Sequence, residues 1–205
     1  MKLRYSPTSP YVRKVMVLAI EAGIDGKIEK DKTAASPVER NESLYADNPI
    51  GKVPSLTTDD GMTLFDSPVI CEYLDAEHAG GKFFPARGKA RWMALRQHAI
   101  ADGLLDAALL ARYESAMRPE ALRWDAWHDG QKGKVASALD MLEKEAADLG
   151  GPITIGQIAV GCALGYLDFR FAAEPWREAH PKLAVWFESA SKHRAFAETM
   201  PVAPK

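Results

Sequence analysis

The sequence predicts an α/β domain with the element order βαβαββα, followed by an all-α domain that forms a helical bundle. Short apolar runs of strand length alternate with helical patterns up to about residue 78, whereas apolar residues beyond that point recur only at helical spacing. A Gly-Gly-Lys segment separates the two patterns. We therefore place the first domain at residues 1–79, a linker at about residues 80–85, and the helical domain at residues 86–205.

A strand and a capped helix open the chain. Residues 2–5 have the length of a strand, and the loop that follows contains two prolines and three hydroxyl side chains. Ser9 fits the N-cap of a helix, and Pro10 fits its first position, where the missing N–H of proline is of no consequence. Apolar residues then share one face as far as Gly23, at which we expect the helix to end.

The next two elements are weakly marked. Residues 27–32 alternate apolar and charged side chains only in part, and we expect a strand there. Farther along, Ser36 and Pro37 fit the start of a short helix, which the pair Asn48-Pro49 ends.

A hairpin and a second capped helix occupy residues 48–75. Val53-Pro54 leads a short apolar run, and the Asp-Asp-Gly sequence at residues 59–61 suits the tight turn of an antiparallel hairpin. Ser67 is a good N-cap for the helix that follows, and Asp66 directly precedes it. This helix therefore begins beside a carboxylate and a hydroxyl group.

The second domain begins with two long helical patterns, at residues 88–118 and 120–149, which predict an antiparallel pair; a break at residues 130–133 is left open. Thr154 and Gln157 then fit a capping box at the start of a third helix. This third helix is apolar on nearly every side, which is typical of a helix in the middle of a bundle. One or two further helices complete the domain.

The composition argues against several classes of protein. Twenty-six basic and 28 acidic residues give a net charge of −2 without a block of five like charges, so the sequence predicts neither a nucleic-acid partner nor a basic membrane face. No apolar run approaches the ~18 residues of a membrane span, and the start of the chain does not resemble a secretory signal. Cys71 and Cys162 lie in apolar helical patterns and are expected to be buried, reduced thiols. We therefore expect a cytoplasmic protein.

Metal and dithiol redox chemistry are not indicated by the sequence. The chain has no Cys-x-x-Cys motif, its five histidines lack the spacing of metal ligands, and it has no glycine-rich phosphate loop. We expect no metal cofactor.

Three motifs resemble those of the cytosolic glutathione S-transferases. The segment from Ser9 to Val15, Ser-Pro-Tyr-Val-Arg-Lys-Val, is similar to the Ser-Pro-aromatic-x-x-Arg/Lys-Val segment of bacterial serine-type members. The other two motifs are Val53-Pro54 at the head of a hairpin and Asp66-Ser67 at the start of a helix. The resemblance covers essentially the whole chain. It implies a thioredoxin-like first domain, glutathione as co-substrate and a homodimer.

The resemblance also implies a glutathione site in the first domain. By this resemblance the Val53-Pro54 bond is cis, and the backbone of Val53 pairs with the cysteinyl unit of glutathione. Asp66 accepts from the ammonium group of the γ-glutamyl unit, and the Ser67 amide meets the carboxylate of that unit. Lys52 lies where relatives place a side chain near the glycyl carboxylate.

Ser9 is the expected catalytic residue, because the corresponding hydroxyl of serine-type relatives donates to the glutathione sulfur. A helix N-terminus stabilises a nearby anion by about 0.3–1 kcal/mol, up to ~2 kcal/mol when partly buried, and a hydrogen bond to a charged partner adds about 1.5–3 kcal/mol. Together these effects lower the pKa of a thiol from about 8.5 by about 1.5–3 units. Ser6 is an alternative donor, and Tyr5 would be the choice in a tyrosine-type enzyme.

The acceptor site is less clearly marked than the glutathione site. Relatives build it from the first loop and from the first helices of the second domain, which points to Tyr11, Tyr113 and Met117, with Tyr166 as a further candidate. Each of these side chains also fits a place in the core. Asp102 lies where some relatives contact the glutathione of the partner subunit, and a solvated helix face is the alternative.

We therefore expect a glutathione transferase that conjugates the thiolate of glutathione to a small, hydrophobic electrophile. A glutathione-transferase-like binding or regulatory protein without turnover and a glutathione-dependent reductase or peroxidase are the alternatives. The sequence does not name the acceptor.

One position departs from the family pattern. Relatives open the central helix of the second domain with Ser/Thr-x-x-Asp, whereas this chain carries Gln157 at the last position. Because a carboxylate adds about 0.3–1 kcal/mol at a helix N-terminus, Gln157→Asp is expected from the sequence to raise the melting temperature.

Overall fold

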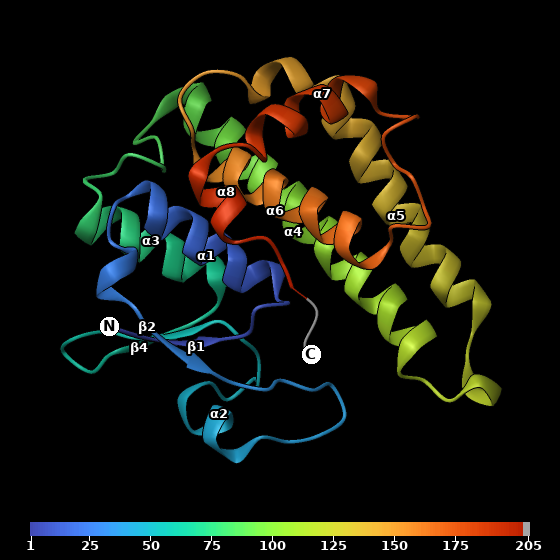
Figure 1. Ribbon diagram of the computed structural model, residues 1–205, viewed down its shortest axis with the longest axis horizontal. Coiled ribbons are helices and arrows are strands. Elements are labelled where there is room, and N and C mark those ends of the chain that lie inside the picture. Colours follow the sequence, from blue (N-terminus) through green and yellow to red (C-terminus); the bar gives the residue numbers. More distant parts are fainter. Residues whose placement is uncertain (203–205) are drawn as a thin grey trace. The chain divides into compact units, whose positions relative to one another are not determined.

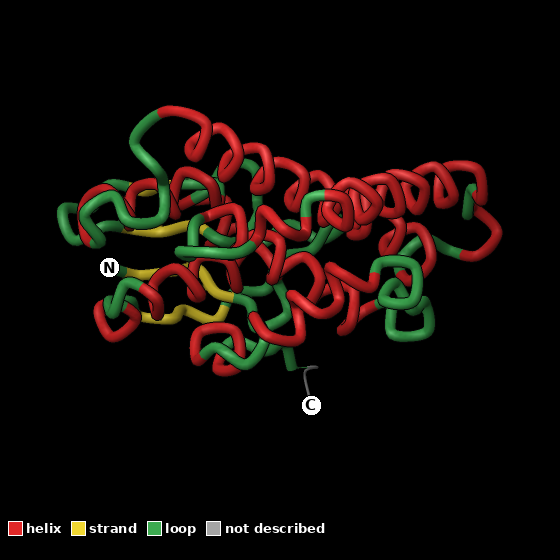
Figure 2. The backbone as a smooth tube through the Cα atoms, turned by 90° about the horizontal axis from the view of Figure 1, so that it is seen from above, coloured by secondary structure: helices red, strands yellow, loops and turns green. Residues whose placement is uncertain are grey.

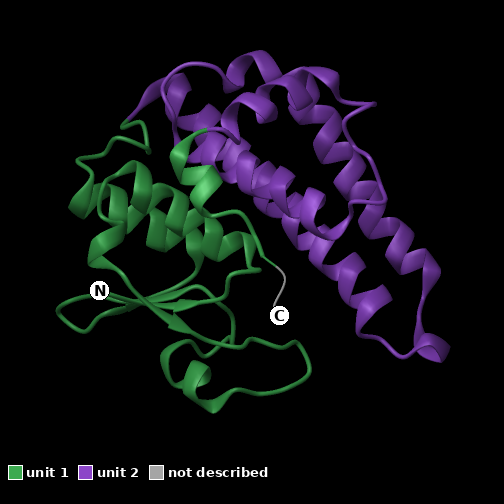
Figure 3. Ribbon diagram, in the orientation of Figure 1, with its two compact units in different colours: residues 1–86, 193–205 green, residues 87–192 purple. Residues whose placement is uncertain are grey.

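The structure, a computed structural model (Figure 1), describes residues 1–202. Helix accounts for most of the chain, and the strands are confined to one small sheet (Figure 2). Two compact units are present (Figure 3): one contains residues 1–86 and the segment from residue 193 onward, and the other contains residues 87–192. The predicted domain limits at residues 79 and 86 stay a prediction. None of the helices within residues 1–202 has the length and apolar composition needed to cross a membrane.

The first unit is built on a mixed sheet in the strand order β2-β1-β3-β4. Its strands are β1 (Lys2–Tyr5), β2 (Glu29–Lys32), β3 (Ser55–Thr57) and β4 (Thr63–Leu64). β2 runs parallel to β1 and therefore needs a helical crossover, whereas β3 is antiparallel to both β1 and β4. The β3–β4 hairpin needs only a tight turn, in which Gly61 has a φ of 88°. The predicted thioredoxin-like order βαβαββα is confirmed.

The helices of the first unit are α1 (Pro10–Glu21), α2 (Glu42–Asp47), α3 (Ser67–His78) and α8 (Arg194–Glu198), with a 3-10 turn η1 (Asp25–Lys27). α1 and α3 pack against each other. The core that they form with the sheet includes Leu3, Val15, Leu18, Leu56, Ile70 and Leu74. α1 ends as predicted, because Gly23 directly follows its last turn with a φ of 70°.

The predicted start of α2 is wrong. This helix begins at Glu42 with Asn41 as its N-cap, and not at Ser36. The Ser36 hydroxyl instead accepts hydrogen bonds from the backbone N–H groups of Val38 and Glu39. Such local side-chain bonds compete with helix formation, so a serine that resembles an N-cap can stabilise a turn instead.

A buried carboxylate fixes the segment that follows α3. Asp75, which is 1% exposed, accepts hydrogen bonds from the backbone N–H groups of Phe83 at 2.9 Å and Phe84 at 2.8 Å. Its backbone carbonyl accepts from the N–H groups of Ala79 and Gly81, both at 3.1 Å. One residue of α3 therefore holds much of the segment that the sequence predicts to be a linker.

The second unit is entirely helical. Its elements are α4 (Gly88–Ala116), η2 (Glu120–Leu122), α5 (Asp125–Lys144), η3 (Ala146–Leu149), α6 (Ile155–Arg170) and α7 (Pro181–Ala190). α5 runs through residues 130–133 without a break, so the open alternative of an interruption there is wrong. α6 is buried from Ile155 to Leu167 and packs most extensively against α4, which confirms its predicted position in the middle of the bundle.

α4 and α6 run in the same direction along their shared face (Figure 1). Gly156, at the start of α6, lies so close to α4 that a methyl group at this position would come within 3.0 Å of the Ala94 carbonyl oxygen and of Gln97 Cβ. Near the other end of α6, the positive charge of Arg112 in α4 acts to lower the pKa of the Tyr166 phenol. The two helices therefore run parallel, with Gly156 at a close contact near the start of α6.

The predicted capping box forms at the start of α6. The backbone N–H of Thr154 donates to Gln157 Oε1 at 2.7 Å, and the reciprocal bond to the Thr154 side chain is present. The amide nitrogen of Gln157 also donates, to the carbonyl of Pro152 at 3.0 Å and to that of Leu149 at 3.4 Å. Gln157 is 6% exposed, and both ends of its amide are engaged.

These donor bonds reverse the expected effect of Gln157→Asp. Aspartate can cap the helix but cannot donate to the preceding loop, and it brings a charge close to carbonyl oxygens. We expect a destabilisation of about 1–2 kcal/mol, which lowers the melting temperature by about 2–8 °C in a chain of this size. Thermal unfolding measures the change.

Gln157→Glu is the matched control, because it keeps the side-chain length and the acceptor but removes the amide donors. It should also melt below the wild type. A melting temperature of either variant at or above the wild-type value contradicts the role given to these donors.

Candidate functional site

Three chain segments of the first unit converge at one edge of the sheet. Arg4 near the end of β1 pairs with Ser55 at the start of β3, and Leu56 of β3 pairs with Leu64 at the end of β4. The loop after β1, the segment before β3 and the segment after β4 therefore leave the sheet on the same side. These segments carry Ser9, Lys52-Val53-Pro54 and Asp66-Ser67 respectively, so the structure brings the predicted glutathione-site segments together.

Ser9 is the N-cap of α1, as predicted. Its Oγ accepts a hydrogen bond from the backbone N–H of Val12 at 3.3 Å, and its side chain is half-buried. Within residues 1–202, no acceptor takes the proton of the Ser9 hydroxyl. Ser9 thus caps the helix with its lone pair and keeps an O–H group that can donate to a ligand beside the positive end of α1.

The neighbouring hydroxyl groups are less suited to that task. Ser6 Oγ lies 3.3 Å from Thr8 Oγ1, so the two hydroxyls share a hydrogen bond. Burial raises the pKa of the Tyr5 phenol above its usual value, and Lys30 Nζ lies 5.6 Å from the centre of the Tyr5 ring. The phenol therefore stays protonated at neutral pH and packs toward β2, in agreement with its predicted place in the strand.

The segment before β3 is shaped by two residues, Asn48 and Gly51, that the sequence analysis did not assign to the site. The fully buried Asn48 donates through its side-chain amide to the Lys52 carbonyl at 2.8 Å and accepts from the Ile50 N–H at 3.1 Å. Gly51 has a φ of 63°, and a Cβ at this position would overlap the ring of Tyr45. The Asn48-Pro49 pair is the signal for this turn, although from the sequence it indicates only the end of a helix.

Lys52, Val53 and Pro54 follow this turn. The Val53–Pro54 bond is cis, as the resemblance implies, and both residues are buried. The side chain of Lys52 is exposed. Its ammonium group is therefore accessible to an anion at this edge of the sheet.

The start of α3 differs from its prediction by one residue. Ser67 is the first residue of the helix and is 1% exposed, whereas Asp66 is the N-cap and is exposed. Within the described chain, the Asp66 carboxylate makes no capping hydrogen bond to the first turn. Because a helix N-terminus favours negative charge, the amide groups here suit a ligand carboxylate, and the exposed Asp66 suits an ammonium group.

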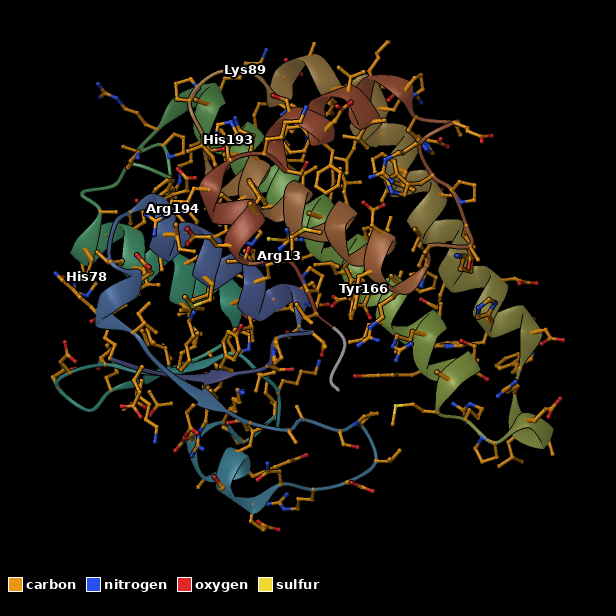
Figure 4. All side chains as sticks on the ribbon, in the orientation of Figure 1. Arg13, His78, Lys89, Tyr166, His193 and Arg194 are labelled. Carbon is orange, nitrogen blue, oxygen red and sulfur yellow. The ribbon has the colours of Figure 1, made fainter. Side chains whose placement is uncertain are left out.

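Arg13, which belongs to the same motif as Ser9, has a structural role that the sequence did not reveal. Its guanidinium donates to the Phe196 carbonyl at 3.0 Å and to Thr199 Oγ1 at 3.2 Å, so it attaches α8 to α1 (Figure 4). A cavity of about 80 Å³ lies here within the first unit. Its lining includes Tyr5, Ser6, Ser9, Arg13, Lys30 and Thr199.

The predicted acceptor residues are distributed over both units. Tyr11 is half-buried in the first turn of α1, with Lys14 Nζ 5.9 Å from the centre of its ring. Tyr113 lies in α4, Met117 is the exposed C-cap of that helix, and Tyr166 lies in α6. Their assignment to the acceptor stays a prediction.

Tyr166 of α6 lies near enough to Tyr113 of α4 for the two phenols to interact electrostatically. Tyr166 is 3% exposed, and burial raises the pKa of its phenol to about 12. Burial also raises the pKa of Tyr113. The positive charges of Arg112 and Arg170 act to lower the pKa of Tyr166, and that of Arg112 acts to lower the pKa of Tyr113. The sequence analysis did not single out these two arginines.

Asp102 lies in α4 and is paired within its own chain. Its Oδ2 is 3.2 Å from His98 Nε2, one helical turn earlier. Its proposed contact with the glutathione of a partner subunit stays a prediction. A search of residues 1–202 finds no group of three or more histidine, cysteine, aspartate and glutamate side chains arranged to hold a metal ion.

Two sequence families match this chain. The profile of the "Glutathione S-transferase, N-terminal domain" matches residues 8–77, and that of the "Glutathione S-transferase, C-terminal domain" matches residues 125–189. A curated relative, the "Uncharacterized GST-like protein YibF" of Escherichia coli K12, is 34% identical over 204 residues, which cover 98% of each chain.

Solved structures show the same similarity over the full length. A glutathione transferase family member from Pseudomonas fluorescens Pf-5 with bound glutathione is 44% identical, with a TM-score of 0.96 over 98% of this chain and 99% of the other. A structure from the same organism with bound S-(propanoic acid)-glutathione is 43% identical, with a TM-score of 0.91 over 99% and 100%. A glutathione S-transferase from Methylobacillus flagellatus KT with glutathione bound is 35% identical, with a TM-score of 0.87 over 98% and 99%.

Proposed function

Because the chain belongs to the glutathione S-transferase family, we propose that it binds glutathione and transfers the thiolate to a small electrophilic acceptor with an apolar body. The observation that carries this proposal is the convergence of Ser9, Val53-Pro54 and Asp66-Ser67 at one edge of the sheet. Relatives of 35–44% identity that hold glutathione or S-(propanoic acid)-glutathione support it.

The proposed binding mode assigns one part of glutathione to each segment. The γ-glutamyl carboxylate meets the Ser67 amide at the positive end of α3, and its ammonium group meets Asp66. The backbone of Val53, next to Pro54, pairs with the cysteinyl unit, as an added strand pairs with a sheet edge. Lys52 attracts the glycyl carboxylate.

The proposed chemistry is activation of the thiol by Ser9. The thiol loses its proton to solvent, and the Ser9 hydroxyl donates a hydrogen bond to the thiolate beside the N-terminus of α1. The thiolate then attacks the electrophilic carbon of the acceptor, forming a C–S bond while the leaving group departs with its electron pair. Holding thiolate and acceptor together contributes the rest of the rate.

The proposal includes assembly and location. We propose a homodimer in the cytoplasm, as the family resemblance and the sequence composition led us to expect. Sedimentation equilibrium of the purified chain measures the assembly directly.

Asp66→Asn tests the glutathione site by calorimetry. We expect the wild type to bind glutathione and Asp66→Asn to bind it about 10- to 100-fold more weakly, because a charge-assisted hydrogen bond is lost. Glu77→Gln is the matched control, since it removes an exposed carboxylate at the opposite end of α3.

The control should bind as the wild type does. Equal affinity of all three proteins contradicts the placement of the γ-glutamyl unit, and no binding by the wild type contradicts the proposed function itself. Tight binding without turnover of any electrophile would instead favour the alternative of a binding or regulatory protein.

A further inference from the structure

Two arginines of the second unit lie at the same level of two neighbouring helices. α4 and α6 run parallel from the point where Gly156 lies close to Ala94 and Gln97. Arg170 follows Gly156 by 14 residues along α6, which is about 21 Å at 1.5 Å per residue. The same distance along α4, counted from Ala94 and Gln97, leads to residues 108–111, the turn just before Arg112. The pKa of Arg170 is lowered by its burial and by the charge of Arg112, in agreement with this placement.

No carboxylate within residues 1–202 neutralises this arginine pair. The acidic residues nearest in sequence are engaged elsewhere, since Glu114 binds Arg118 at 2.7 Å and Asp168 binds Arg177 at 2.5 Å. The Nε atom of Arg170 is buried and has no hydrogen-bond partner within the described chain. A buried donor of a charged group is unfavourable when it has no acceptor, so Arg170 lacks a hydrogen-bond partner that a ligand could provide.

Aromatic side chains lie beside both arginines. The guanidinium carbon of Arg170 lies 4.0 Å from the centre of the Phe169 ring. Tyr166 lies one helical turn before Arg170 and meets Phe171 edge-on, with 6.4 Å between ring centres, and Tyr113 lies next to Arg112. The surroundings are therefore cationic at the guanidinium groups and apolar beside them.

We propose that Arg112 and Arg170 bind the carboxylate of an organic anion whose apolar body contacts the half-buried Tyr113. The fork of an arginine side chain matches the geometry of a carboxylate, and an anion between two guanidinium groups removes their mutual repulsion. The identification of this anion as the acceptor rests on the proposed function. The acceptor is then an electrophile that carries a carboxylate, and not a purely hydrophobic one.

A matched pair of ligands tests the anion site without any reaction. Calorimetry of the full-length protein compares 4-nitrobenzoate, an anion at neutral pH, with the neutral 4-nitrobenzamide. We expect the wild type to bind the anion about 10-fold or more tightly than the amide, because hydrogen bonds to a charged group are strong. In the double variant Arg112→Gln/Arg170→Gln the ratio of the two affinities should fall to about one, while the affinity for the amide changes little.

Arg123→Gln is the control, because it removes an exposed arginine of the same unit.

Reaction rates then test whether the anion site binds the acceptor of the thiolate transfer. With 4-chloro-3-nitrobenzoate, the thiolate forms a C–S bond at the ring carbon that loses chloride, and chloride leaves with the electron pair. The wild type should prefer this acceptor over its neutral amide, and the double variant should lose the preference while glutathione binding stays unchanged.

Two results would overturn the inference. One is that the wild type binds the anion and the amide with about equal affinity. The other is that the double variant keeps the full preference of the wild type for the anion. Absence of glutathione binding is a separate outcome, which contradicts the proposed function and, with it, the identification of the anion as an acceptor.

Discussion

Ser9→Ala is expected to reduce kcat/KM at neutral pH by about 10- to 150-fold, because the thiolate loses a hydrogen bond of about 1.5–3 kcal/mol. The positive end of α1 remains, so part of the thiol activation remains as well. Among residues 1–202, Ser9 Oγ accepts a hydrogen bond only from the Val12 N–H, and its proton is available for the sulfur. Steady-state kinetics with a chromogenic electrophile measures the loss.

The pH dependence distinguishes this role from a structural one. The hydrogen bond stabilises the charged thiolate, so its removal raises the pKa of the bound thiol by about 1–2 units. The deficit of Ser9→Ala should therefore be largest below the raised pKa and should shrink as the pH rises through it. Loss of the helix cap alone, about 1 kcal/mol of stability, predicts no such recovery.

Ser6→Ala is the matched control for Ser9→Ala, since it removes a hydroxyl of the same loop. It should change kcat/KM by less than about threefold. A larger loss for Ser6→Ala than for Ser9→Ala would transfer the catalytic role to Ser6.

Asp75→Ala is expected to lower the free energy of unfolding by about 2–5 kcal/mol. Two backbone N–H groups, those of Phe83 and Phe84, lose a carboxylate acceptor in a buried place, and each unsatisfied donor costs about 1–3 kcal/mol. The segment after α3 should then detach locally. Urea unfolding measures the stability, and hydrogen exchange at residues 79–84 shows whether the loss is local.

Glu77→Ala removes a carboxylate from the exposed face of the same helix. We expect a change within about 0.5 kcal/mol. Equal destabilisation by both substitutions would contradict the role given to the buried carboxylate, because alanine itself favours a helix at least as much as either acidic residue.

Features encoded by residues close together in the sequence could be predicted. Ser9 and Pro10 at a helix start, the Thr154–Gln157 capping box and the turn at residues 59–61 each depend on one short segment. Capping side chains favour a helix start, and the glycine of a hairpin turn permits the positive φ that the turn needs. The candidate glutathione site consists of such segments, and the sheet register then brings them together.

Contacts between residues far apart in the chain could not be predicted. The bonds of Arg13 to α8 span 183 residues or more, and Arg112 and Arg170 come from different helices. Nothing local marks these arginines, since a surface arginine on a helix has the same sequence pattern. The structure reverses the expectation for Gln157→Asp for a similar reason, because the donor bonds of the amide go to a loop whose path the sequence does not specify.

The ultraviolet absorbance of glutathione bound to the wild-type protein, followed against pH, tests the central claim most directly. Stabilisation by Ser9 and by the N-terminus of α1 predicts that the bound thiol titrates about 1.5–3 units below the value of about 8.5 for a free thiol. At least about half of the thiolate absorbance should then be developed at pH 7. Bound glutathione that titrates at about 8.5 would contradict thiol activation at Ser9, even if glutathione binds tightly.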